Sequence, residues 1–180
     1  SAETFTRAAH RLEKKGRIVK PVRGFYFIVP LEYSKSSVPP IWYIDDLMTF
    51  LDAKYYISLL SAASIYGAGH QQPQRLQVMS EKHRRDIITC DQTIGFYTVS
   101  DIVSRSIKDR NTQTGYYKVA LPEQVVVDLV SYYKHAGYFN HIATVLSELQ
   151  EQLNSNQIVA CAQRAGIATA QRLGYILDYV

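Results

Sequence analysis

A stripe of cationic and hydroxyl side chains opens the chain. Residues 3–15 contain neither proline nor glycine, and one face of the helix that they predict carries Thr4, Arg7, Arg11 and Lys14. Guanidinium, ammonium and hydroxyl groups in such a row can bind phosphate oxygens and read base edges in the major groove of DNA. The stripe therefore predicts a nucleic-acid-binding helix. The alternative interpretation is a solvated basic face on an ordinary surface helix.

The residues that follow indicate how this helix is held. Two short apolar runs over 17–29 are separated by Pro21 and Gly24, which predicts a β-hairpin. A helix followed by a hairpin with a basic tip is typical of the second half of a winged helix-turn-helix. We therefore predict a partial module of this kind over residues 1–35, with its recognition helix at 3–15 and its wing at 17–29.

The hairpin is expected to contribute to the same interface. In a winged module the wing contacts the DNA backbone or the minor groove beside the recognition helix. The basic residues of the hairpin that we expect to make these contacts are Arg17, Lys20 and Arg23. Because a helix-turn-helix includes a helix before the recognition helix, we also expect further helices before Ser1.

The charge distribution supports a polyanionic partner for this module. Residues 1–35 carry eight Lys/Arg and three Asp/Glu, a net charge of +5, whereas the rest of the chain carries twelve and thirteen, a net charge of −1. No apolar run approaches the roughly 20 residues that span a bilayer, so no membrane partner is expected. Cys90 and Cys161 share no metal-ligand spacing, and we interpret both as free thiols in a reducing cytoplasm.

The remaining sequence predicts a larger α+β domain. Residues 36–42, with two consecutive prolines, predict a semi-rigid linker, and residues 43–180 the domain itself. Its expected elements are two helices over 44–67, strands over 75–80, 84–90 and 94–99, a loop and a strand over 109–120, and helices from Pro122 onward. This order indicates a small antiparallel or mixed sheet followed by a C-terminal helical bundle.

Motifs for catalysis are missing from the sequence. It contains no glycine-rich phosphate loop, nucleophile elbow, metalloprotease motif or paired CxxC, and its five histidines have no ligand spacing. Asp45 and Asp46 are more simply the start of a helix than a metal pair. Asp86 and Asp91 flank a predicted strand without the Glu-x-Lys that a nuclease would add. We therefore expect no catalytic residues, no metal and no cofactor, and hence no enzyme.

Two places in the larger domain could form a second binding surface. One is the loop at 67–74, which contains His70, Gln71, Gln72 and Gln74; the alternative is a plain solvated turn. The other is the segment 75–118, with eight Lys/Arg against five acids, which includes Arg84 and Arg85. It is either an anion-binding surface or a set of edge strands whose charges discourage aggregation.

Several segments resemble a known protein family. "YYISLLSAASIYGAGHQQPQ", "TGYYKVALPEQVVVDLV", "IATVLSELQEQL" and "AQRLGYILDYV" are similar to the AbiEi family of bacterial antitoxins and transcriptional regulators. "RAAHRLEKKGRIVKPVRGFYFIVP" resembles the winged helix-turn-helix of that family. The resemblance covers nearly the whole chain, and "YGAGHQQPQ" and "TGYYKVALPE" are its most specific parts.

The resemblance implies a two-part protein from a type IV toxin–antitoxin operon, of the kind used in abortive infection and phage defence. The N-terminal module of that family binds operator DNA and represses its own operon. We expect an inverted-repeat operator and a monomer or weak dimer. The C-terminal domain of the family neutralises a nucleotidyltransferase-like toxin without a stable complex, and the 67–74 loop with Arg84 and Arg85 is our candidate antitoxin surface.

Two other functions remain open from the sequence. One is a winged-helix transcriptional regulator whose larger domain senses a ligand or a protein, with no toxin partner. The other is a small nuclease or transferase, which would lose activity when Asp86 or Asp91 is changed.

Overall fold

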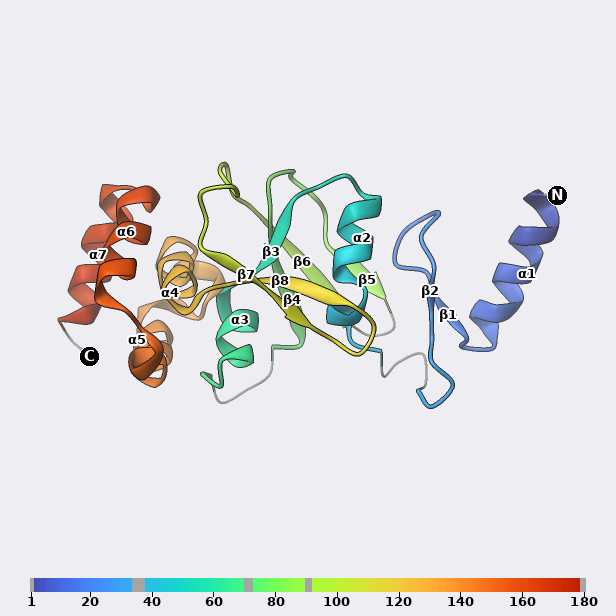
Figure 1. Cartoon of the computed structure of the whole chain (residues 1–180), viewed down its shortest axis with the longest axis horizontal. Helices are drawn as coiled ribbons and strands as arrows, with labels where there is room; N and C mark the ends of the chain where they lie inside the picture. The colour runs from blue at the N-terminus through green and yellow to red at the C-terminus, as the bar shows by residue number, and fades with distance from the viewer. Residues whose placement is uncertain (1, 34–37, 70–72, 90–91, 179–180) are drawn as a thin grey trace.

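A computed structural model describes residues 2–33, 38–69, 73–89 and 92–178 (Figure 1). The molecule is elongated, with the N-terminal helix at one end and the last helices at the other (Figure 1). Between them lies a mixed sheet with helices on both sides. The predicted α+β class is confirmed. In the described part of the chain, no helix combines the length and the apolar character needed to cross a membrane.

The N-terminal module is a helix followed by a hairpin, as predicted. Helix α1 (Ala2–Lys14) precedes β1 (Ile18–Val19) and β2 (Phe27–Ile28), which pair antiparallel. The helix ends in a Schellman turn, because Gly16 has a φ of 69° and the Arg17 N–H reaches the Leu12 carbonyl at 2.9 Å. Lys14 and Arg11 lie in the last turn, where the helix dipole favours cations.

The large sheet has six strands in the order β5-β6-β4-β3-β8-β7. Neighbours β4/β6 and β3/β8 are parallel, and the other three pairs are antiparallel. The strands run over Tyr55–Ile57 (β3), Arg75–Ser80 (β4), Ile87–Thr89 (β5), Gln92–Thr98 (β6), Ile107–Asn111 (β7) and Tyr116–Ala120 (β8). Strand β4 has the predicted bounds.

The prediction of two helices over 44–67 is wrong in its middle. Helix α2 (Ile44–Phe50) and helix α3 (Leu59–Ile65) are separated by β3, a central strand of the sheet. All three residues of β3 are buried, so the strand has no alternation of apolar and polar residues to distinguish it from a buried helix. Positive φ angles at Asp52 (47°) and Leu59 (56°) also prevent one helix from running into the next.

The predicted loop before the "GYYKVA" strand is also partly wrong. Its first residues, Asp109 to Asn111, belong to the edge strand β7. The sequence of this strand is charged like that of a loop, because an exposed edge strand carries Lys, Asp and Arg to discourage pairing with other molecules.

The C-terminal helices form the predicted bundle around one buried helix. Helix α4 (Pro122–Ser131) starts with proline in its first turn and is buried from Pro122 to Val130. It lies between the sheet and the helices that follow (Figure 1). These are η3 (Tyr133–His135), α5 (Tyr138–Leu149), η4 (Gln150–Gln152), α6 (Ser155–Ala165) and α7 (Ile167–Leu177).

The core is continuous from the hairpin to the bundle. Val19 and Val29 of the hairpin belong to the same buried cluster as the sheet and α4. In the described part of the predicted linker, Val38 and Pro40 are buried and Pro40–Trp42 forms a short 3-10 helix, η2. The connection is therefore packed against the sheet domain from Val38 onward.

Candidate nucleic-acid interface

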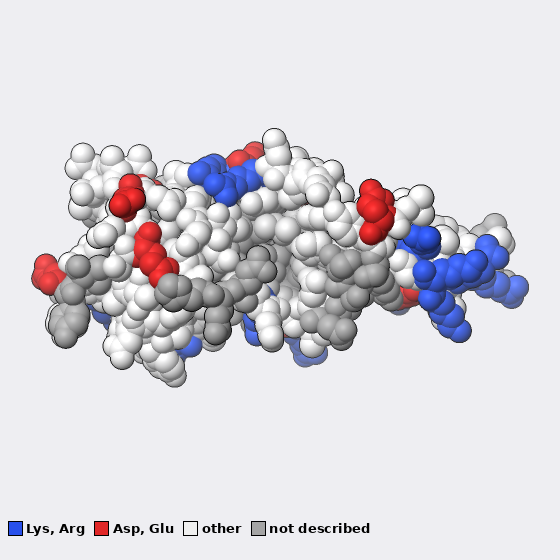
Figure 2. All heavy atoms as spheres, turned by 90° about the horizontal axis from the view of Figure 1, so that it is seen from below, with Lys and Arg blue, Asp and Glu red and all other residues white. Residues whose placement is uncertain are grey.

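The predicted recognition stripe lies on the surface of α1. Thr4, Arg7, Arg11 and Lys14 are all exposed, at positions that share one side of the helix. Arg17, Lys20 and Arg23 of the hairpin are exposed as well. Figure 2 shows Lys and Arg side chains gathered at this end of the molecule. The structure therefore places the seven predicted DNA-binding residues on the one module.

The helix and the hairpin are joined through the backbone of one residue. The Arg17 N–H donates to the Leu12 carbonyl of α1, and the Arg17 carbonyl accepts from Val29 N–H of the returning chain, both at 2.9 Å. The end of the stripe and the base of the wing are therefore held at a defined distance.

Tyr26 makes a second connection between α1 and the wing, and sequence reasoning missed it. Its ring meets the Phe5 ring edge-on with centroids 5.7 Å apart, and the Lys20 ammonium lies 5.6 Å from the Tyr26 centroid. The hairpin register, Ile18 opposite Ile28, places Lys20 opposite Tyr26. This register is a feature of the folded hairpin, so no pattern in the sequence identifies Tyr26.

The wing packs on the sheet domain through Phe25 and Phe27. Gly24 has a φ of +91°, and Phe25 after it lies 5.7 Å from Phe50 of α2 and 6.4 Å from Tyr43, centroid to centroid. Phe27 packs on Tyr43 at 5.2 Å. These contacts orient the wing relative to α2 and leave Arg23 at the exposed tip.

The module also exposes apolar side chains. Phe5 of α1 is 61% exposed even with its Tyr26 contact, and Leu12, Ile28 and Leu31 are exposed as well. The helix face that carries Phe5 and Leu12 is different from the face of the recognition stripe.

The three candidate antitoxin residues that the structure describes do not form one cluster. Gln74 is exposed and lines a hollow of about 600 Å³ with Pro40 and Thr93. Gln74 comes just before β4 in the chain, whereas Arg84 and Arg85 come after it. Arg84 donates to the Leu51 carbonyl at 2.7 Å, and Arg85 is exposed. His70, Gln71 and Gln72 lie outside the described residues.

A buried carboxylate joins the sheet to α4. Asp128 accepts hydrogen bonds from Tyr56 Oη (3.0 Å), Ser58 Oγ (2.7 Å) and Gln124 Nε2 (2.8 Å). Burial raises the pKa of Asp128, and the hydrogen bond from Ser58 is the largest influence that lowers it. Asp128 also borders a hollow of about 430 Å³ with Arg105 at its edge. The three satisfied donors point to a structural role for this carboxylate.

A third hollow lies beside α2. It measures about 550 Å³ and is lined by Asp45, Met48 and Thr49 of α2 and by Tyr55 and Lys118 of the sheet. Tyr55 donates its hydroxyl to Asp45 at 3.0 Å, and burial is the main cause that raises the pKa of Tyr55. Among the described residues, no group of three or more His, Cys, Asp and Glu side chains could hold a metal ion. Cys161 is a buried free thiol, and Cys90 lies outside the described residues.

Comparisons with known proteins identify the fold and the family. No curated protein matches the chain. A crystal structure of the RV2827C protein from Mycobacterium tuberculosis is similar, with a TM-score of 0.72 and 17% sequence identity. The match covers 96% of this chain and 64% of that one, so the chain spans less than two thirds of the related structure, and the likeness shows a shared fold. The family model of the AbiEi antitoxin C-terminal domain matches residues 56–179, well over half of the sequence, and the chain therefore belongs to the AbiEi antitoxin family.

Proposed function

We propose that this chain is a type IV antitoxin that binds the operator of its own operon through residues 1–35 and represses it. Its sheet domain and helical bundle would counteract a nucleotidyltransferase-like toxin encoded with it. Family membership supports the antitoxin role. The observation that carries the DNA-binding part is the exposure of all seven predicted contact residues on a helix and a hairpin that are clamped together.

The chemistry of the module divides into two kinds of contact. Arg7 in the middle of α1 and Arg11 in its last turn would read base edges, because a guanidinium can make two parallel hydrogen bonds to guanine. Arg17 and Lys20 would bind phosphates, and Arg23 at the wing tip would enter the adjacent groove. Such an interface gives sequence preference through the helix and salt-dependent affinity through the wing.

The antitoxin role would be a matter of binding, without catalysis by this chain and in the bacterial cytoplasm. We propose functional antagonism of the toxin without a stable complex. The surface around Gln74 and the exposed Arg85 are the described candidates for it.

Operator binding is tested with the DNA segment upstream of the gene that encodes the chain. Fluorescence anisotropy would compare the intact protein, an Arg7→Ala/Arg11→Ala double variant and an Arg85→Ala control. The control removes an arginine that is also exposed, from the sheet domain. We expect the double variant to lose about 2–6 kcal/mol of binding free energy, from about 1–3 kcal/mol for each base-reading arginine. Equal affinities of the double variant and the control would contradict the assignment.

A second candidate function is a winged-helix regulator that senses a small ligand. The observation that favours it is the 550 Å³ hollow, because Met48 and Thr49 line it and the next residue, Phe50, contacts Phe25 of the wing. A ligand in this hollow would then act on the wing through α2. A downstream gene that is harmless to the cell when expressed alone would favour this candidate over the antitoxin.

A further inference from the structure

An aromatic surface lies at the end of the molecule opposite to the basic module. The rings of Tyr133 in η3 and Phe139 in α5 stack face to face, with centroids 4.7 Å apart and planes within 9°. Tyr138 meets Tyr133 edge-on at 6.2 Å. Together with Tyr175 of α7 we call these residues the aromatic surface.

Three of these four rings are exposed to solvent. Tyr175 is 73% exposed, Tyr138 is 62% exposed and Phe139 is 37% exposed. Tyr138 also has a φ of 63°, in the left-handed region that a bulky side chain rarely occupies. The start of α5 therefore keeps an unfavourable backbone conformation while a large ring points into solvent, an arrangement that is typical of functional positions.

A small slot opens between α5 and α7 beside these rings. It has a volume of about 280 Å³ and is lined by Phe139, Tyr175 and Ile176, with Gln171 and Arg172. This volume is just below the roughly 300 Å³ at which pockets for drug-sized ligands begin. Two aromatic rings, an amide and a guanidinium line the slot, and these groups can stack on a planar ring and bind its polar edge.

Two cations lie beside the aromatic surface. The Lys134 ammonium and the Arg172 guanidinium lie 5.9 Å and 5.6 Å from the Tyr133 ring centroid. The acids nearest in sequence are Glu148 in α5 and the exposed Asp178 after α7. Cations beside exposed aromatic rings are complementary to a chain of bases joined by phosphates.

We propose that the aromatic surface binds single-stranded nucleic acid, with unpaired bases stacked on Tyr138 and Tyr175 and phosphates paired with Lys134 and Arg172. Stacking requires bases that are free of a duplex, so this site is distinct in chemistry from the basic module at the other end. It does not depend on operator binding. A protein partner is the alternative occupant, which the test below distinguishes from nucleic acid.

The test uses the intact chain and labelled single-stranded oligouridylate and oligoadenylate of about ten nucleotides, a length within the site sizes of such proteins. An excess of unlabelled duplex DNA occupies the basic module during the titration. The variants are Tyr175→Ala and Arg172→Gln. The matched control is Tyr116→Ala, which removes a 46% exposed tyrosine of β8 whose ring also has a cation over it, Lys118 at 5.4 Å.

We expect both oligonucleotides to bind, and Tyr175→Ala to weaken both by about fivefold or more, as for the loss of one stacked base. Arg172→Gln should weaken binding and reduce its salt dependence, and Tyr116→Ala should leave the affinity unchanged. The proposal would be overturned if duplex DNA abolished all binding, or if the Tyr116 and Tyr175 variants behaved alike. An unchanged oligonucleotide affinity in Tyr175→Ala together with a loss of toxin neutralisation would also overturn it and assign the surface to a protein partner.

Discussion

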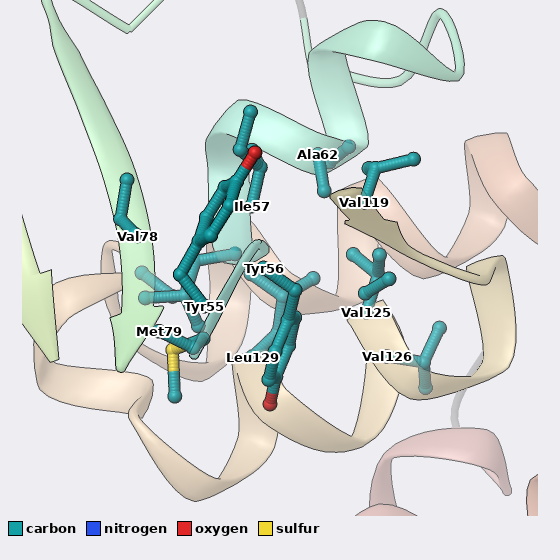
Figure 3. Close-up of a cluster of buried hydrophobic side chains, with 14 of the residues drawn as sticks. Tyr55, Tyr56, Ile57, Ala62, Val78, Met79, Val119, Val125, Val126 and Leu129 are labelled. Carbon is teal, nitrogen blue, oxygen red and sulfur yellow. The ribbon is translucent and has the colours of Figure 1, made fainter. Parts of the chain in front are cut away.

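Tyr56 of β3 donates its hydroxyl to Oδ2 of Asp128 in α4, 3.0 Å away, across the boundary between the sheet and the helical bundle. Figure 3 shows Tyr56 directed toward α4, on the opposite side of β3 from Tyr55. Ser58, between the end of β3 and the start of α3, donates to the same oxygen at 2.7 Å. One buried carboxylate thus aligns the central strand with the central helix of the family domain.

The first prediction is that Asp128→Ala destabilises the protein strongly. The change leaves the buried hydroxyls of Tyr56 and Ser58 without their acceptor, and each such loss costs about 1–3 kcal/mol. We expect the free energy of unfolding in urea to fall by about 2–6 kcal/mol. Asp178→Ala, at an exposed position, is the control and should stay within about 0.5 kcal/mol of the intact protein. A similar small effect for Asp128→Ala would show that the network does not hold the sheet to α4.

The second prediction concerns pH. Because burial raises the pKa of Asp128, the folded state holds this proton more tightly than the unfolded chain does. Above the ordinary carboxyl value of 3.8, the unfolded state binds fewer protons at this site, so its contribution to stability decreases as pH rises. Asp128→Asn lacks this titration. The free energy of unfolding of Asp128→Asn should therefore increase relative to that of the intact protein as the pH rises from about 4 to about 8. A difference that stays constant or shrinks over this range would contradict the raised pKa.

The third prediction separates the wing from the recognition helix in DNA binding. Arg17→Ala and Lys20→Ala should weaken binding to operator and to unrelated duplex alike. Each should reduce the slope of log affinity against log salt by about 0.9, the value for one lost phosphate contact. Affinity titrations at several salt concentrations measure both quantities. A loss confined to the operator would instead make these residues base-reading contacts.

The fourth prediction tests the wing conformation. Gly24→Ala places a methyl group at a φ of +91°, where its carbon would lie 3.2 Å from the Phe50 ring. A left-handed conformation costs a residue with a side chain about 1–2 kcal/mol, so we expect a loss of that order in stability or in DNA affinity. Gly115→Ala is the matched control, because a Cβ there meets no atom within 4 Å. Thermal unfolding and operator binding of both variants provide the comparison.

The elements that the sequence predicted well are those with a strong local signal. Strand β4 is bounded by turn residues, and Pro122 marks the start of α4. Strand β3 was not predicted, because a short strand that is buried on both faces has the same apolar composition as a buried helix. Edge strand β7 was missed for the opposite reason, since the charged residues that face solvent give it the composition of a loop.

The residues of the candidate nucleic-acid interface also include some that local patterns predict and some that they do not. The stripe on α1 follows from helical spacing within a few turns and was predictable. The contact of Tyr26 with Phe5 depends on the hairpin register and on how the hairpin folds back on α1. The packing of Phe25 on Phe50 joins two segments of the chain through tertiary structure. The spacing of residues along the chain does not indicate such contacts, so Tyr26 and Phe25 were identified only from the structure.

The proposed function separates neutralisation of the toxin from repression of the operon by residues 1–35. A growth assay tests this separation in cells that express the downstream gene together with this protein, supplied from a promoter that it does not control. The intact chain and the Arg7→Ala/Arg11→Ala variant would be compared, with a reporter for the native operator in the same cells. We expect both proteins to restore growth and only the intact chain to repress the reporter. A downstream gene without toxicity, or a failure of both proteins to restore growth, would rule out the antitoxin role.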